Sequence, residues 1–157
     1  MRAATGLVDP YSTHQEALVF AALSTSGSIL ELGCGNYSTP ILNQICNLQK
    51  RDFKIISSNK NWLDKYDYVL NKELISKWES YVFKEKYGMV FLDNEQLTIN
   101  RLELIPKIFK ITNTIVVHDA DVMSKWKNWQ LYTVNKKITW FKKYTPHTAI
   151  IENEYTV

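Results

Sequence analysis

The stretch Ser28–Pro40, which reads SILELGCGNYSTP, decides the fold. Its first residues are mostly apolar and stop at Gly33, a pattern that is typical of a short buried strand ending in a tight turn. Ser38 or Thr39 can then cap a helix that carries Pro40 in its first turn. The stretch therefore predicts a strand, a glycine turn and a helix in immediate succession.

The chain on either side continues this alternation of strands and helices. Ser12 with Gln15, or Thr13 with Glu16, forms a capping box that predicts a helix over 13–23. The other clear elements are a helix over 41–48, strands over 53–57, 88–92 and 114–117, a helix over 102–109, and C-terminal strands over 138–143 and 147–151.

The segment 61–87 has a weaker pattern. Apolar residues between Trp62 and Leu70 favour a helix, while Trp78–Phe83 fits either a second helix or a third strand.

Two connections indicate the fold class. A strand, a helix and a second strand within residues 28–57 form a crossover, which makes the two strands parallel, whereas the last two strands form a hairpin. We expect a Rossmann-like, doubly wound α/β fold with a mostly parallel sheet and an antiparallel C-terminal hairpin. With 157 residues, 45% of them hydrophobic, the chain suffices for one such domain over residues 1–157 and is too short for two.

Charge and cysteine content exclude several classes of protein. A formal net charge of +3 is far below that of a dedicated nucleic-acid-binding domain. The sequence contains no apolar run of transmembrane length, and residues 1–10 lack the apolar core of a secretory signal. Cys34 and Cys46 are too few for a disulfide framework or a zinc cluster. We therefore expect a cytoplasmic protein with no membrane partner.

Polar residues follow each predicted strand of the parallel sheet. In such sheets, ligands bind beyond the carboxyl ends of the strands. Glycines let the backbone turn and approach a ligand, and the helix that follows offers free N–H groups. A carboxylate at Glu31 can accept hydrogen bonds from a cationic amine and disfavours a pyrophosphate. The strand-end residues are Glu31, Gly33, Gly35, Ser57, Ser58, Asn59, Asp93, His118, Asp119 and Asp121.

These motifs resemble the class I S-adenosylmethionine-dependent methyltransferases, and among them the O-methyltransferase-like branch. ILELGCG, residues 29–35, is similar to the family's first motif, an acidic residue and a Gly-x-Gly turn after the first strand. GCGNYSTPIL is similar to a variant in small-molecule and glycan-type members, where Ser-Thr replaces a third glycine. YGMVFLDN, the helix around Arg101 and TIVVHDADV resemble the fourth and fifth strands, so the resemblance covers about Ser12–Ile151.

The resemblance implies S-adenosylmethionine as the cofactor and places it beside the glycine turn. Valine at Gly33 or Gly35 is then expected to abolish cofactor binding without unfolding the domain. The cofactor-binding residues would be His14, Glu31, Gly33, Cys34, Gly35, Tyr37, Ser38, Asn59 and Asp93. The catalytic residues, which would orient or deprotonate the methyl acceptor, are Asp93, His118 and Asp119.

Two positions depart from the family pattern. The family ends its second strand with a carboxylate that binds both ribose hydroxyls, and this chain has Asn59 there, which lacks the charge. Metal-dependent members hold magnesium with two strand-end acids and an amide. Here those positions are Asp93, Asp119 and Ala120, and Ala120 cannot coordinate, so magnesium is expected only if Asp121 takes its place. No metal ligands are therefore assigned.

Other roles for these residues remain open. Asp93 is also suited to capping a helix after Asn94, and His118 to a place in the core. Lysines and tryptophans between Val122 and Ile151 fit an anionic partner such as nucleic acid, but a solvated face with tryptophans packed in the core is favoured.

The function expected from the resemblance is methyl transfer to a small-molecule or glycan-type acceptor. The segment Asp93-Asn94-Glu95-Gln96 differs from the Pro-Pro-Tyr motifs of adenine and glutamine methyltransferases, which argues against those acceptors. The alternatives are a non-catalytic S-adenosylmethionine-binding module and a different reaction on the same cofactor, namely lyase cleavage or aminopropyl transfer. The oligomeric state is left open.

Overall fold

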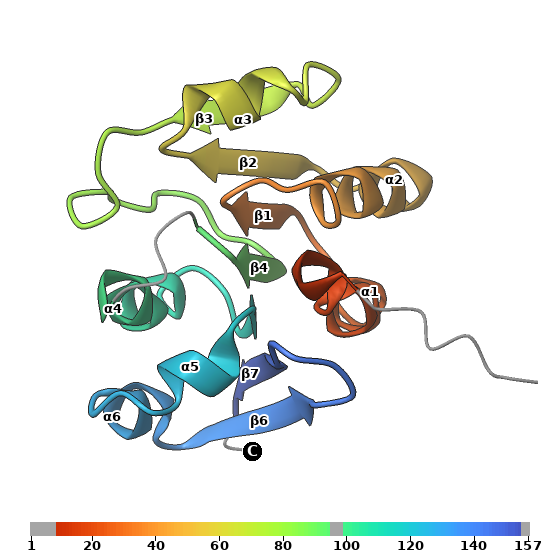
Figure 1. The fold of residues 1–157 in the computed structure, drawn as a ribbon. Coiled ribbons are helices and arrows are strands. Elements are labelled where there is room, and N and C mark those ends of the chain that lie inside the picture. The colour runs from red at the N-terminus through yellow and green to blue at the C-terminus, as the bar shows by residue number, and fades with distance from the viewer. Residues whose placement is uncertain (1–8, 95–98, 155–157) are drawn as a thin grey trace, which may run out of the picture.

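A computed structural model describes residues 9–94 and 99–154 and contains a seven-stranded sheet in the order β3-β2-β1-β4-β5-β7-β6 (Figure 1). The strands are β1 (Ile29–Leu32), β2 (Phe53–Ser57), β3 (Asn71–Leu74), β4 (Met89–Leu92), β5 (Thr114–Val117), β6 (Lys136–Phe141) and β7 (Thr148–Asn153). The helices are the 3-10 turn η1 (Pro10–Ser12) and α1 (Gln15–Ser24), α2 (Thr39–Gln49), α3 (Lys60–Asp64), α4 (Ile99–Ile108), α5 (Ala120–Met123) and α6 (Trp129–Thr133).

Strand pairing confirms the predicted fold class. The strands from β3 to β5 run parallel to one another, and β7 is antiparallel both to β5 and to β6. The chain therefore forms a mostly parallel sheet that ends in an antiparallel C-terminal hairpin, as the sequence predicts. No helix in the described part of the chain is long and apolar enough to cross a membrane.

The central strands are buried on both faces because helices cover each face of the sheet. Along β1, Leu30 and Leu32 pack on the side of α4, α5 and α6, whereas Ile29 packs on the side of α1 and α2. Figure 1 shows these two helical layers on opposite sides of the sheet. Burial on both faces explains why the central strands read as continuous apolar runs rather than as alternating patterns.

The third strand lies at Asn71–Leu74, so the alternative that placed it at Trp78–Phe83 is wrong. The expected helix over 62–70 is also shorter and occupies Lys60–Asp64. β3 is an edge strand with mostly exposed side chains, and only its backbone pairing with β2 defines it, which leaves no apolar pattern to detect. Trp78 is buried without belonging to a helix or strand, and no helix forms within residues 75–88.

The predicted capping box before α1 is wrong as well. The hydroxyl of Ser12 donates to the carbonyl of Asp9, and that of Thr13 is oriented toward the carbonyls of Pro10 and Pro146. Both side chains are used by the η1 turn and its packing, so α1 begins at Gln15, one or two residues later than a capping box at Thr13 or Ser12 requires. His14 takes the N-cap position and makes no capping hydrogen bond with its side chain.

The tryptophans of the C-terminal segment pack into the core on the α4–α6 side of the sheet. Trp129 is buried, and Trp126 and Trp140 are half-buried against the same cluster. Lys137 pairs with Glu152 on the neighbouring strand, and Lys136 bonds Asn153. This arrangement is the one favoured from the sequence, a lysine-bearing face over packed tryptophans.

Candidate active site

A cavity of about 760 Å³ lies at the carboxyl edge of β1, β4 and β5, beneath the start of α1. Its lining combines the glycine turn with the acidic and imidazole side chains at the ends of β4 and β5. Of the predicted site residues, those that line it are His14, Gly33, Cys34, Gly35, Tyr37, Ser38, Asn59, Asp93, His118 and Asp119. Glu31 does not line it. The structure therefore brings together at one place nearly all the residues that the sequence marked.

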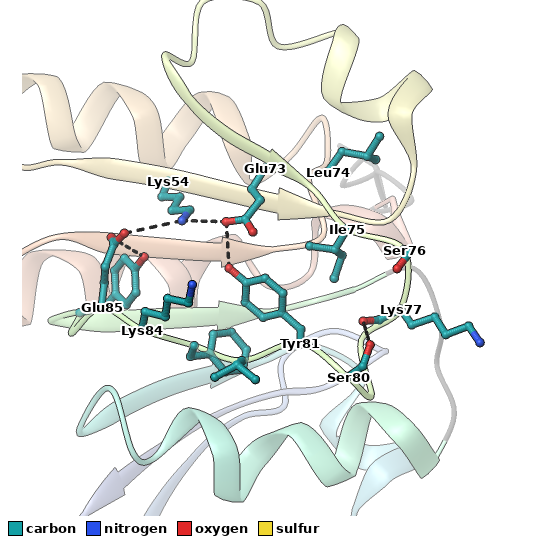
Figure 2. Close-up of a pocket in the computed structure, with 13 residues that line it drawn as sticks. Lys54, Glu73, Leu74, Ile75, Ser76, Lys77, Ser80, Tyr81, Lys84 and Glu85 are labelled. Carbon is teal, nitrogen blue, oxygen red and sulfur yellow. Dashed lines mark hydrogen bonds and ion pairs between the residues drawn. The ribbon is translucent and has the colours of Figure 1, made fainter.

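A second cavity, of about 680 Å³, lies beside the outer strand β3. Figure 2 shows Lys54 between Glu73 and Glu85, at 2.9 and 3.8 Å from their carboxylates, with the hydroxyl of Tyr81 donating to Glu73. These charged groups pair with one another, and no predicted site residue is among those that line the cavity. We therefore place the candidate site at the first cavity.

Gly33 and Gly35 differ in what a side chain at their position would meet. Gly33 has a φ of 83°, and a Cβ there would lie 2.3 Å from the carbonyl oxygen of Asp93. Gly35 has no such conformation, and a Cβ there would meet only the hydroxyl of Ser38, at 3.4 Å. Gly33 is thus required by the protein's own packing, whereas the space beside Gly35 is left to the cavity. The expectation that valine at Gly33 would leave the domain folded is therefore wrong.

Glu31 does not reach into the cavity and instead holds the glycine turn through hydrogen bonds. Its carboxylate is fully buried and accepts hydrogen bonds from the hydroxyls of Ser38 and Thr39. The Thr39 hydroxyl also accepts the backbone N–H of Gly35, at 3.0 Å. Glu31 therefore links the end of β1 to the first turn of α2 and to the glycine turn. Burial raises the pKa of Glu31 to about 8, although both hydroxyls act in the opposite direction.

The raised pKa of Glu31 predicts a pH-dependent stability. In the unfolded chain the carboxyl loses its proton near its ordinary pKa of 4.5, but in the folded protein it keeps that proton up to about pH 8. The free energy of unfolding should therefore fall as the pH rises between these two values, by on the order of 4 kcal/mol, and this loss should be absent in Glu31→Gln. Urea unfolding of both proteins from pH 5 to pH 8.5 measures it. Parallel curves for the two proteins would contradict it.

At the ends of β4 and β5, Arg101 holds two carboxylates together. Its Nη1 atom lies 3.0 Å from Oδ2 of Asp119 and 3.4 Å from Oδ1 of Asp93, and its Nη2 atom donates to the carbonyl of Asn94. The guanidinium is almost fully buried. Asp119 has a φ of 57°, a left-handed backbone conformation that is uncommon outside glycine, asparagine and aspartate. Arg101 thus fixes the direction of both carboxylates.

His118 and His14 lie next to these carboxylates, and their pKa values are shifted in opposite directions. Nδ1 of His118 is 3.2 Å from Oδ2 of Asp93, and the ring centroids of the two histidines are 4.7 Å apart. Burial by itself lowers the pKa of His118, but Asp93 and Asp119 outweigh it and raise that pKa above its ordinary value. Burial, and then the neighbouring His118, lower the pKa of His14 to about 4, against smaller opposing effects of Asp93 and the backbone of Tyr37. His14 is therefore neutral at neutral pH.

Asn59 and Trp62 line the cavity on its α3 side. Asn59 is the N-cap of α3, and its side-chain oxygen accepts the backbone N–H of Trp62 at 3.3 Å. The amide is thus already engaged with the protein at the position where the resemblance expects a ribose-binding carboxylate. Trp62 is half-buried, and Nζ of Lys65 lies 3.8 Å from the centroid of its ring.

Sequence reasoning did not assign Arg101 and Trp62 to the site. A signal for Arg101 was present, because it shares the apolar face of α4 with Ile105 and Ile108, and a charge on such a face needs a buried partner. Trp62 offered no such signal, since a tryptophan at helical spacing is as well explained by the core.

A magnesium site of the kind implied by the resemblance does not fit these residues. Ala120 is fully buried and offers no ligand. Asp121 cannot replace it, because it accepts the backbone N–H of His147 and does not line the cavity. Arg101 already places a positive charge between Asp93 and Asp119.

No protein-family model and no curated protein sequence matches this chain. Solved structures do match it. The O-methyltransferase TomG from Streptomyces achromogenes, solved in complex with SAM, is 12% identical with a TM-score of 0.64, over 94% of this chain and 82% of TomG. The chain has the class I methyltransferase fold.

Two further methyltransferase structures agree with this fold. One from Geobacter sulfurreducens has a TM-score of 0.63 at 8% identity, over 94% of this chain and 80% of its own. The SAH-bound enzyme PaMTH1 from Podospora anserina has a TM-score of 0.61 at 11% identity, over 90% and 78%. In the class I methyltransferase fold of this chain, the strand order reverses between β1 and β4, and the cavity opens there, where open α/β sheets bind ligands.

Proposed function

We propose that this protein transfers a methyl group from S-adenosylmethionine to an oxygen or nitrogen atom of a small-molecule or glycan-type acceptor. The observation that carries the proposal is the cavity at the switch point of the sheet, with open space beside Gly35, where an added Cβ would meet only the hydroxyl of Ser38, at 3.4 Å. Its volume of about 760 Å³ is in the range of small-molecule and cofactor sites. TomG, a structural neighbour, is an O-methyltransferase solved with SAM, which favours an oxygen acceptor.

In this proposal the cofactor lies along the glycine turn. Gly35 lets its backbone approach the ligand, and Asn59 with Trp62 faces the nucleoside end. Cys34, Tyr37 and Ser38 line the cavity beside the turn, while Glu31 keeps the turn in place through Thr39.

The acceptor lies against the ends of β4 and β5. The carbon–sulfur bond of the sulfonium breaks as the bond from the methyl carbon to the acceptor atom forms, and S-adenosylhomocysteine is released. Holding the two reactants in line supplies most of the rate enhancement in such a displacement. Asp93, His118 and Asp119 surround the acceptor position, orient its hydroxyl or amine and take up its proton.

Calorimetric titration of the purified protein with S-adenosylmethionine and S-adenosylhomocysteine tests the cofactor assignment. Dissociation constants in the micromolar range are expected for both. Absence of binding by both compounds would contradict the proposal.

Asn59→Asp should tighten cofactor binding by about tenfold. A carboxylate forms charge-assisted hydrogen bonds with the ribose hydroxyls, which are roughly twice as strong as those of an amide. Aspartate also caps helices as well as asparagine does, so α3 should persist. The matched control is Asn61→Asp, which adds the same charge on the exposed side of α3. Equal tightening in both variants would show a general charge effect and not a ribose contact.

The engaged amide of Asn59 favours a second candidate, a non-catalytic S-adenosylmethionine-binding module, because its oxygen already accepts from Trp62. A different reaction on the same cofactor, lyase cleavage or aminopropyl transfer, is a third. Product analysis separates them: S-adenosylhomocysteine indicates methyl transfer, methylthioadenosine indicates the other reactions, and no turnover with any acceptor indicates the module.

A further inference from the structure

His14, Asp93 and His118 come from three separate parts of the chain and meet at the cavity. His14 is the N-cap of α1, Asp93 follows β4, and His118 follows β5. One ligand atom from each lies within 4.8 Å of the other two. We propose that these three side chains bind a divalent transition-metal ion.

The environment of His14 is the first reason. The side chain is 2% exposed, and neither ring nitrogen has a hydrogen-bond partner of good geometry among the described residues, although the backbone of Tyr37 lies near enough to raise the pKa of the ring. It lies against the rings of Phe91 and His118 at centroid distances of 4.9 and 4.7 Å. A buried imidazole without well-formed hydrogen bonds is unfavourable, and the residues that the structure describes supply no such partner for its free lone pair.

The hydrogen bonds around His118 give the second reason. The hydroxyl of Thr13 donates to the carbonyl of Pro146 at 2.8 Å, so toward Nε2 of His118, 3.2 Å away, its oxygen can only accept. Nε2 therefore carries the proton of the neutral ring, and Nδ1 carries the lone pair. That lone pair faces Oδ2 of Asp93 at 3.2 Å. Two acceptors this close need a cation between them, which is either a proton or a metal ion.

The donor set indicates which metal. Imidazole nitrogens suit zinc, iron and copper, whereas magnesium prefers oxygen ligands throughout. Two histidines and one carboxylate leave further positions open, as in catalytic zinc sites and non-haem iron sites. This set differs from the oxygen-ligand set rejected above, because it uses the two histidines in place of Asp119 and Ala120.

The charges around the cavity favour a dication. Asp9, Asp93 and Asp119 line it, and Arg101 is the only lysine or arginine among the described lining residues. Arg101 contacts Oδ1 of Asp93 and leaves Oδ2 directed to His118, so it orients the carboxylate as an outer partner of a metal ligand does.

Binding requires a modest closure of the cluster. Ligand atoms around one tetrahedral zinc ion lie about 3.4 Å apart, given zinc–nitrogen distances of about 2.1 Å. The ligand atoms lie within 4.8 Å of one another, so they have to approach by at most roughly 1.4 Å. Small shifts of the His14 and His118 side chains would supply this, since the described residues hold neither Nδ1 nor Nε2 of His14 by a hydrogen bond of good geometry.

A role for the ion in catalysis rests on the proposed function. An ion at this place would polarise an acceptor hydroxyl and lower its pKa. His118 would then be a ligand, and Asp119 would be left as the group that takes up the acceptor's proton. Binding of the ion itself does not depend on that role.

The test is titration of the full, untagged chain with Zn²⁺ after treatment with a chelator, followed by calorimetry and repeated with Co²⁺ and its visible absorption. One ion per chain is expected, with no competition from excess Mg²⁺. His14→Phe keeps an aromatic ring against Phe91 but has no ligand atom, and it should weaken Zn²⁺ binding by about 100-fold or more. His118→Ala should do the same. His147→Ala, at the remaining histidine of the chain, is the matched control and should bind as the wild type does.

The outcomes separate this proposal from the proposed function. Absence of Zn²⁺ and Co²⁺ binding, or equal binding by His14→Phe and the wild type, would overturn the metal site even if S-adenosylmethionine binds. Conversely, Zn²⁺ binding that depends on His14 and persists in Gly35→Val supports the metal site even if S-adenosylmethionine does not bind. Circular dichroism of each variant verifies that it is folded.

Discussion

Gly35→Val should abolish S-adenosylmethionine binding and leave the protein folded. The valine side chain would point into the space beside the turn, where a Cβ meets no protein atom closer than the Ser38 hydroxyl at 3.4 Å. Because Gly35 does not have a positive φ, valine can adopt its backbone conformation. The added methyl groups would occupy the place proposed for the cofactor, and a loss of at least 100-fold in affinity is expected, since even misplacement by about 1 Å is costly at such sites.

Gly33→Val provides the contrast. Its Cβ would lie 2.3 Å from the backbone of Asp93, and its φ of 83° disfavours any β-branched residue. This variant should fail to fold or should melt far below the wild type, whereas Gly35→Val should melt close to it. Calorimetric titration and thermal unfolding of both variants measure the two effects. Undiminished binding by a folded Gly35→Val protein would remove the cofactor from this cavity.

The fold was predictable because each central strand is an apolar run that is followed directly by polar residues of the candidate site. Each buried strand reads as an apolar run that stops at a polar residue, as Leu32 does before Gly33 and Val117 before His118. Parallel pairing then brings those ends to one edge of the sheet. Position along the chain and strand direction were therefore enough to predict that the strand-end residues Gly33, Asp93, His118 and Asp119 line one cavity.

The features that the sequence did not reveal are an edge strand, which depends on backbone pairing, and side-chain contacts between distant parts of the chain. β3 has no apolar pattern, because it lies at the edge of the sheet with mostly exposed side chains and pairs with β2 through the backbone. Glu31 was expected to face a ligand, but alternation along β1 does not show that the hydroxyls of Ser38 and Thr39 cover its carboxylate. His14 and His118 are far apart in sequence, and their contact follows only from the way α1 crosses β4 and β5.

Arg101→Met should destabilise the protein by about 3 kcal/mol, because it removes the cation that two carboxylates share. Methionine replaces most of the buried aliphatic volume of arginine, so the loss of charge and hydrogen bonds dominates the effect. The side chains of Asp93 and Asp119 keep 26% and 18% of their exposure, and partial hydration places the effect at the lower end of the range for broken buried ion pairs. Urea unfolding at neutral pH measures it.

A double-mutant cycle with Asp119→Asn determines how much of this loss comes from repulsion between uncompensated carboxylates. In Arg101→Met, Asp93 and Asp119 face each other across the place that the guanidinium occupied, whereas in the double variant the Asp119→Asn substitution removes one of these two charges. The double variant should therefore be more stable than the sum of the two single effects predicts, by about 1–2 kcal/mol. Strict additivity would mean that Arg101 stabilises the fold through the carbonyl of Asn94 and its own packing, and that the two acids at the cavity are oriented by other groups.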